Sequence, residues 1–233
     1  MARTKITNEN DARQAICEMG RLLFTRGYAH ATAGNISIRL NEETLITPTD
    51  ACLGLLEPES LAKIDAQGTQ VSGERASKTI ALHRAIYEHS SQLGIQTNCI
   101  VHTHSTAAVL MSMLVEQRAG KELLDPITPY FVMKVGHVPL IAYARPGAPE
   151  VIDEVTHQMR DYSRAGTPIS AVMLTRLGPV VWGSNPLEAM ARLEELEETA
   201  RLAVQHAMLA APPLKPLEED QLQALRSQFQ AHW

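Results

Sequence analysis

The sequence lacks the features that mark several broad classes of protein. It has no long uninterrupted apolar run, so we expect no helix that spans a membrane. Lys and Arg number 21 against 26 Asp and Glu and are dispersed, which argues against a basic surface for nucleic acid. The three cysteines, Cys17, Cys52 and Cys99, are too irregularly spaced for a disulfide framework. A small molecule is therefore the expected partner.

Nothing in the composition divides the chain into several domains. The 233 residues contain no Pro/Gly/Ser linker, internal repeat or low-complexity tract. We predict one domain over residues 1–210 and a tail over 211–233 that contains a short helix. The segment Met1–Asp11 is polar and lacks the apolar core of a signal peptide, so we expect a cytoplasmic protein.

Hydrophobic periodicity predicts helices interleaved with hairpins. Asn8 is a suitable N-cap for a helix over 9–26, and a hairpin follows over 36–47. Further helices are predicted over 77–90, 105–114, 149–161 and 186–209, and strands over 99–104, 139–142, 171–174 and 179–182. This order indicates a layered α/β or α+β domain.

Two histidines separated by one residue end an apolar strand in the middle of the chain. They are His102 and His104, which follow the run Cys99-Ile100-Val101. Side chains alternate between the faces of a strand, so both imidazoles point the same way. Neutral imidazole is a common zinc ligand and a catalytic zinc takes about three protein ligands, so the pair is half of a metal site. The alternative is a hydrogen-bonded histidine pair without metal.

Other short segments accompany this pair along the chain. They are Gly34-Asn35-Ile36-Ser37, Ile46-Thr47-Pro48-Thr49, Ala76-Ser77-Lys78-Thr79, Gly136-His137-Val138-Pro139 and Glu194-Glu195-Leu196-Glu197-Glu198. In order and spacing they resemble the class II aldolase and adducin-head family, whose enzymes carry a Gly-Asn-x-Ser turn, an Ile-Thr-Pro-Thr strand, a Pro-Ser-Lys-Glu helix start and His-x-His. The resemblance extends from Arg13 to Leu202.

This resemblance implies a fold, an assembly and a reaction class. The fold is a single-domain three-layer sandwich with a mixed, largely antiparallel central sheet flanked by helices. The assembly is a cyclic homotetramer with sites between subunits. The chain looks most like the 3-oxo-tetronate 4-phosphate decarboxylases, which share Lys78, a Thr-Pro-Tyr segment ending at Tyr130 and the helix around Glu194–Ala200. We expect the charged run of that helix to be a solvated face.

A phosphate site is predicted where glycine, amide, hydroxyl and amine groups meet a helix start. The resemblance places the phosphate-binding segments of the family on Gly34, Asn35, Thr49, Asp50, Ser77 and Lys78. Free N–H groups at a helix start favour an anion, and Lys78 adds a point charge for phosphate or carboxylate. Asp50 stands where the aldolases usually have glycine, so it must turn away from phosphate or bind a sugar hydroxyl.

Two positions depart from the family pattern. The acid/base glutamate of the family falls on Thr79, and its third zinc histidine, in an Asn-His-Gly turn, falls on Leu177. Threonine is no acid near neutral pH and leucine binds no metal. The site is therefore either degenerate or completed by another residue.

Four other residues are weighed for roles in the site. His137 is the best candidate for a third metal ligand, with a backbone-capped turn histidine as the alternative. Family enzymes use a tyrosine near Tyr130 as proton donor. The predicted catalytic residues are Tyr130 and Lys78. Arg176 could grip a substrate carboxylate, whereas His83 is expected to be a hydrogen-bonded core histidine.

The expected reaction is metal-assisted carbon–carbon cleavage of a small phosphorylated keto sugar acid, with Zn2+ or another divalent transition metal as cofactor. Release of carbon dioxide from a β-keto acid needs no base, so loss of the glutamate at Thr79 harms a decarboxylase less than an aldolase. The alternatives are a sugar-phosphate aldolase or pentulose-phosphate 4-epimerase, and a non-catalytic adducin-like scaffold.

Overall fold

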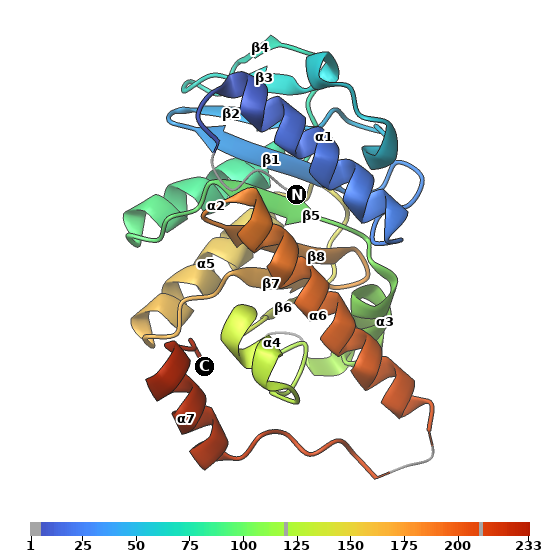
Figure 1. The fold of residues 1–233 in the computed structure, drawn as a ribbon, viewed down its shortest axis with the longest axis vertical. Helices are drawn as coiled ribbons and strands as arrows, with labels where there is room; N and C mark the ends of the chain where they lie inside the picture. Colours follow the sequence, from blue (N-terminus) through green and yellow to red (C-terminus); the bar gives the residue numbers. More distant parts are fainter. Residues whose placement is uncertain (1–5, 119–120, 210–211) are drawn as a thin grey trace. The chain divides into compact units, whose positions relative to one another are not determined.

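The computed structural model describes residues 6–118, 121–209 and 212–233. The chain divides into two compact units, of which the first contains the residues up to His104 with Val181–Met190, and the second contains Ser105–Val180 with Ala191–Trp233. The strands follow the order β4-β3-β2-β1-β5-β8-β7-β6 in one mixed eight-stranded sheet (Figure 1). The sheet and its helices confirm the predicted fold class.

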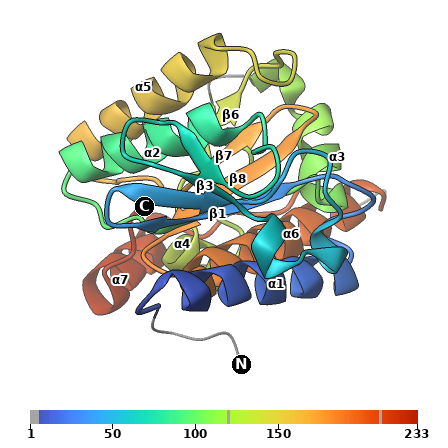
Figure 2. The same ribbon diagram turned by 90° about the horizontal axis from the view of Figure 1, so that it is seen from above.

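The first unit is built on antiparallel strands. Its strands are β1 (Asn35–Leu40), β2 (Glu43–Ile46), β3 (Ala62–Ile64), β4 (Gln70–Ser72) and β5 (Cys99–His102). Each neighbouring pair from β4 to β5 is antiparallel, and β1 meets β5 with Asn35 opposite His102. Helices α1 (Glu9–Thr25) and α2 (Ile80–Gln92) cover opposite faces of these strands (Figure 2). The short helices η1 (Leu53–Leu55) and η2 (Pro58–Ser60) complete the unit.

The second unit holds most of the remaining helices. Its elements are α3 (Thr106–Leu114), η3 (Glu116–Arg118), α4 (Pro129–Lys134), β6 (Leu140–Ile141), α5 (Glu150–Arg164), β7 (Ala171–Leu174) and α7 (Glu219–Phe229). β8 (Gly178–Gly183) and α6 (Pro186–Ala207) contribute residues to both units. β6 and β7 are parallel, α5 packs on β6, and α7 packs on α4.

The sequence predicts most elements to within a few residues, with two differences among the α-helices. α2 begins at Ile80 rather than Ser77, because the Ile80 N–H already bonds to the Ser77 carbonyl in a turn at 3.1 Å. α4 was not predicted, although Thr128 accepts a hydrogen bond from the Phe131 N–H and Pro129 opens the first turn. The predicted boundary at residues 210–211 and the segment 1–5 lie outside the described residues.

One prediction for α6 was wrong. Glu197 is buried, with 7% of its surface exposed, rather than part of a solvated face. Its carboxylate accepts hydrogen bonds from the Ala107 N–H at 2.7 Å and the Ala108 N–H at 3.0 Å. These N–H groups belong to the first turn of α3, where no carbonyl of the helix can reach them. Glu197 therefore caps α3.

The described residues bear on two expectations from the composition, which concern membrane-spanning helices and disulfides. None of their helices is both long enough and apolar enough to cross a membrane. Cys17, Cys52 and Cys99 are free thiols, and burial raises the pKa of Cys17 to about 11.

Candidate active site

The two histidines of the His-x-His motif lie side by side at the end of β5. Their ring centroids are 5.0 Å apart and the ring planes are inclined by 58°. His102 is 5% exposed and His104 is half-buried. Burial lowers the pKa of His104, and neighbouring His30 lowers it further. The neutral imidazole favoured in this way is the form that binds metal ions.

Gly34 holds the start of β1 against the carbonyl of His102. Its φ is +91°, a left-handed conformation that residues with a Cβ atom rarely adopt. A Cβ at this position would lie 2.8 Å from the carbonyl oxygen of His102. Glycine is required here because the backbone passes so close to the histidine strand, and this approach places Asn35 opposite His102.

The other predicted phosphate-binding residues lie on two neighbouring segments of the first unit. The Thr49 N–H donates to the Arg75 carbonyl at 2.8 Å, and the Ser77 N–H donates to the Thr47 carbonyl at 3.1 Å. Thr47 is bonded in turn to Ile36 of β1, whose N–H donates to the Thr47 hydroxyl at 3.2 Å. The fold therefore brings the segments that carry Asn35, Thr49 and Ser77 next to one another.

The two charged residues of this region are both exposed. Lys78 follows buried Ser77 and leaves its amine in solvent. Asp50 has a φ of +57°, a left-handed conformation that glycine adopts readily and that aspartate is among the few other residues to tolerate.

Helix α2 contributes two side chains to a buried series of hydrogen bonds. His83 Nδ1 lies 2.8 Å from the Ser37 hydroxyl, which lies 2.8 Å from the Tyr87 hydroxyl. Burial, together with His102, lowers the pKa of His83 to about 3, so its ring is neutral. Within the described residues His83 Nε2 has no hydrogen-bond partner. His83 is a core histidine as expected, but only one of its nitrogens is hydrogen-bonded.

Thr79 does not replace the family glutamate chemically. Its hydroxyl lies 3.0 Å from the Ser77 hydroxyl at the start of α2. A hydroxyl supplies hydrogen bonds but no acid or base near neutral pH. The carboxylate chemistry of the family is therefore missing from this position.

Tyr130, His137, Arg176 and Leu177 belong to the second unit. Tyr130 lies on α4 and is 60% exposed. Arg176 is bound by the Glu116 carboxylate, with Nη2 to Oε2 at 2.6 Å and Nε to Oε1 at 3.1 Å. The guanidinium group that was predicted to bind a substrate carboxylate is therefore already paired with Glu116. Leu177 is partly buried in the turn before β8.

His137 is held by groups that the sequence analysis did not identify. Its Nδ1 lies 2.9 Å from Glu122 Oε1, and Glu122 Oε2 accepts from the Val138 N–H at 2.8 Å. The Tyr162 hydroxyl also donates to Glu122. Spacing in the sequence could not identify these contacts, because Glu122 lies 15 residues from His137 and 40 residues from Tyr162.

The histidine pair offers a divalent metal ion two ligands. His102 and His104 supply two neighbouring imidazoles, whereas a catalytic zinc takes about three protein ligands. Among the described residues, no group of three or more His, Cys, Asp and Glu side chains is placed to hold one metal ion. The prediction that His137 is a third ligand therefore gains no support from the described residues.

Comparison with known proteins identifies the family. The family model for the Class II Aldolase and Adducin N-terminal domain matches residues 14–204. The chain belongs to the class II aldolase and adducin family. Enzymes of this family generally depend on a divalent metal ion.

Relatives within this class II aldolase family share most of the chain. A Cupriavidus necator protein named 3-oxo-tetronate 4-phosphate decarboxylase is 43% identical over 98% of this chain and 100% of its own length. An Escherichia coli K12 protein of the same name is 35% identical over 94% of this chain and 97% of its own. The crystal structure of YgbL from Klebsiella pneumoniae, described as a putative aldolase/epimerase/decarboxylase, has a TM-score of 0.81 at 37% identity and covers 95% of this chain and 100% of its own.

Proposed function

We propose that this protein releases carbon dioxide from 3-oxo-tetronate 4-phosphate and forms dihydroxyacetone phosphate. The observation that carries the proposal is the 43% identity, over 98% of the chain, to a protein named as a decarboxylase of this compound. The predicted phosphate-binding segments lie together in the first unit, which supports a phosphorylated substrate.

The chemistry of the substrate suits a site without a carboxylate base. Its ketone lies β to the carboxylate, so the bond to carbon dioxide breaks when its electron pair moves onto the ketone oxygen. Positive charge or hydrogen-bond donors must stabilise that oxygen, and a proton must then reach the carbon that lost carbon dioxide. Neither step needs the glutamate that Thr79 replaces.

The phosphate is assigned to the groups around the start of β1. Gly34 lets the start of β1 approach the histidine strand, Asn35, Thr49 and Ser77 offer hydrogen bonds, and Lys78 supplies a cation. Asp50 contributes its turn, which has a φ of +57°. Tyr130, whose ring is 60% exposed, is assigned as proton donor.

The metal is assigned to His102 and His104, as Zn2+ or another divalent transition ion. When bound, such an ion supplies positive charge that stabilises the electron pair left by carbon dioxide. The two histidines lie side by side and burial favours the neutral form of His104, which supports this assignment. We also propose that the protein is a homotetramer, as the family resemblance implies, and that it is cytoplasmic.

The test measures carbon dioxide and dihydroxyacetone phosphate from 3-oxo-tetronate 4-phosphate, alongside metal content by elemental analysis. We expect both products in equal amounts, and we expect a His102→Ala/His104→Ala variant to lose metal and activity while it stays folded. Exposed His157→Ala is the matched control and should keep both. Full metal occupancy in the double variant would show that the ion binds elsewhere.

A further inference from the structure

A third charged side chain belongs to the region that carries Lys78 and Asp50. Arg75 lies in the first unit, on the segment that leads from β4 into α2. The Thr49 N–H donates to the Arg75 carbonyl at 2.8 Å, so the backbone of Arg75 adjoins one of the segments to which the phosphate is assigned. The function proposed above gives Arg75 no role.

The pairing of the two segments determines the face on which the Arg75 side chain projects. Pro48 and Ala76 form an isolated antiparallel bridge. The next residues, Thr49 and Arg75, are then opposite each other, and opposite residues project on the same face with Cβ atoms about 4.5–5.5 Å apart. Ala76 packs against a cluster of the hydrophobic core, and side chains alternate, so Arg75 and Ser77 project on the other face. Arg75 therefore shares a face with Thr49 and Ser77.

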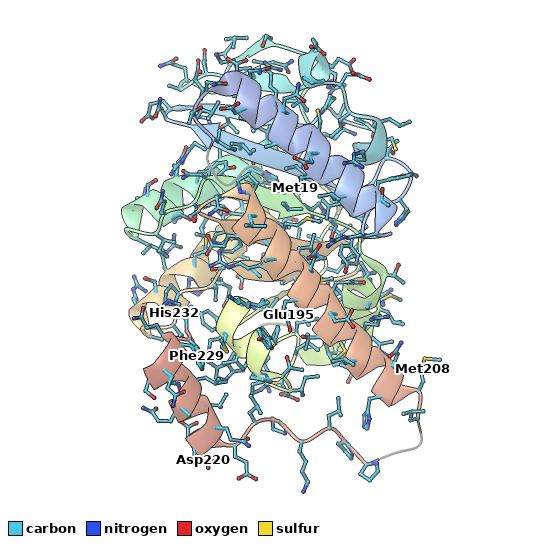
Figure 3. The ribbon with its side chains drawn as sticks, in the orientation of Figure 1. Met19, Glu195, Met208, Asp220, Phe229 and His232 are labelled. Carbon is cyan, nitrogen blue, oxygen red and sulfur yellow. The ribbon has the colours of Figure 1, made fainter. Side chains whose placement is uncertain are left out.

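The backbone around Arg75 is held by the side chain of Gln70. The Gln70 amide N–H donates to the Glu74 carbonyl at 2.7 Å, and the Gln70 side-chain carbonyl accepts from the Ala76 N–H at 3.1 Å. Both neighbours of Arg75 are thus bound by one side chain, in addition to the bond that Arg75 accepts from Thr49. Gln70 belongs to the edge strand β4, around which side chains project outward (Figure 3). The point from which the Arg75 side chain extends is therefore fixed.

The Arg75 guanidinium is available to a ligand. It is exposed, and within the described part of the chain no hydrogen bond or ion pair engages it. A phosphate monoester carries about 1.5 to 2 negative charges at neutral pH. Lys78 supplies one positive charge, which the carboxylate of Asp50 in the same region offsets. Without Arg75, the charged residues of this region would therefore carry no net charge to attract a dianion.

We propose that Arg75 binds the phosphate of the substrate together with Lys78 and that the two cations select a doubly charged phosphate. The proposal rests on the proposed function for the placement of the phosphate at Thr49 and Ser77. A guanidinium offers two parallel N–H groups to two phosphate oxygens, whereas an ammonium acts as a point charge. The substrate carboxylate is the less suitable partner, because a strong bond to it would stabilise the charge that must leave it as carbon dioxide forms.

The test compares two ligands by titration calorimetry, dihydroxyacetone phosphate and dihydroxyacetone sulfate. The sulfate ester has nearly the same shape but carries only one negative charge. We expect Arg75→Ala to weaken binding of the phosphate at least about tenfold and binding of the sulfate by a smaller factor. Arg75→Lys keeps the charge without the paired N–H groups and should bind the phosphate with intermediate affinity. Exposed Arg21→Ala, on α1 of the same unit, is the matched control and should bind as the unmodified protein does.

The fold does not depend on the Arg75 side chain, because the bond to Thr49 uses the Arg75 carbonyl, which every variant keeps. Circular dichroism should therefore give the same urea midpoint for Arg75→Ala and the unmodified protein. Unchanged affinity of Arg75→Ala for dihydroxyacetone phosphate would overturn the proposal. An equal loss of affinity for the two esters would overturn the selection of a doubly charged phosphate.

A second background separates a direct contact from compensation of the Asp50 charge. We expect Arg75→Ala to weaken phosphate binding by the same factor in the Asp50→Asn protein as in the unmodified protein. If the effect of Arg75→Ala disappears in the Asp50→Asn protein, Arg75 only offsets the carboxylate and the proposed contact is wrong.

The outcomes also separate this proposal from the proposed function. With 3-oxo-tetronate 4-phosphate, Arg75→Ala should raise KM and leave kcat almost unchanged, because the phosphate takes no part in the reaction. If no carbon dioxide is released but binding of dihydroxyacetone phosphate depends on Arg75, the reaction is wrong and the contact stands. If carbon dioxide is released and binding does not depend on Arg75, the contact is wrong and the reaction stands.

Discussion

Replacing Gly34 by alanine tests whether the start of β1 is shaped by its approach to the histidine strand. The φ of +91° costs a residue with a Cβ about 1–2 kcal/mol. The new Cβ would also lie 2.8 Å from the His102 carbonyl oxygen, an atom of the backbone that cannot rotate away. Relief of this contact adds roughly 1–2 kcal/mol, the cost of overpacking a core. We expect Gly34→Ala to lower the free energy of unfolding by about 2–4 kcal/mol.

Gly94→Ala is the matched control for the backbone contribution. Gly94 has a φ of +71°, but no heavy atom lies within 4 Å of its added Cβ, so about 1 kcal/mol should be lost. Urea unfolding followed by circular dichroism gives both values, and binding of dihydroxyacetone phosphate should weaken in Gly34→Ala alone. Equal losses of stability with unchanged binding would refute the reasoning that the close approach to His102 requires glycine.

Three further predictions concern a helix cap, a buried histidine and a surface cation. Glu197→Ala removes a buried acceptor of two N–H groups and should lower the free energy of unfolding by about 2–4 kcal/mol. Glu198 belongs to an exposed ion pair, so Glu198→Ala should change the free energy of unfolding by less than about 1 kcal/mol. Equal effects of the two substitutions would contradict the role of Glu197 as a helix cap. His83 stays neutral when folded, with a pKa of about 3 against 6.5 unfolded, so its contribution is complete above pH 6.5 and is lost as pH falls toward 3. Between pH 6.5 and 5 the unfolding free energy should fall by about 2 kcal/mol more than in His83→Gln, and parallel pH profiles would refute this. Lys78→Ala should weaken binding of dihydroxyacetone phosphate by about 1.5–3 kcal/mol, while exposed Lys215→Ala should not, and unchanged affinity in Lys78→Ala would place the phosphate elsewhere.

Local rules predicted much of the fold because they depend on neighbours in the sequence. Asn8 caps α1 as its side chain predicts, accepting from the Asp11 N–H at 2.9 Å. The alternation of β1 and β2 follows from strand geometry, and His102 and His104 lie side by side although β5 ends at His102. The family resemblance added the mixed, largely antiparallel central sheet flanked by helices, which no periodicity could supply, whereas the strand order needed the structure.

The remainder depends on contacts between distant residues. Glu197 was expected in solvent because its own helix face is charged, yet the start of α3, 90 residues away in sequence, needs its carboxylate. Glu122 was not considered for the same reason, since nothing near it in sequence indicates the His137 ring. The positions of Tyr130 and Arg176 in the fold also needed the structure, which shows Arg176 already paired with Glu116.

The most direct test of the proposed reaction is the ratio of two products from one preparation. The protein would be incubated separately with 3-oxo-tetronate 4-phosphate labelled with ¹³C in the carboxylate and with ketose 1-phosphates, and carbon dioxide and aldehyde would be measured. Because Thr79 leaves the site without a carboxylate base, we predict a kcat/KM for carbon dioxide release at least about 100-fold above that for aldehyde formation, the scale of one general base. Aldehyde formed at an equal or greater kcat/KM, or neither product from protein that binds no metal, would contradict the account.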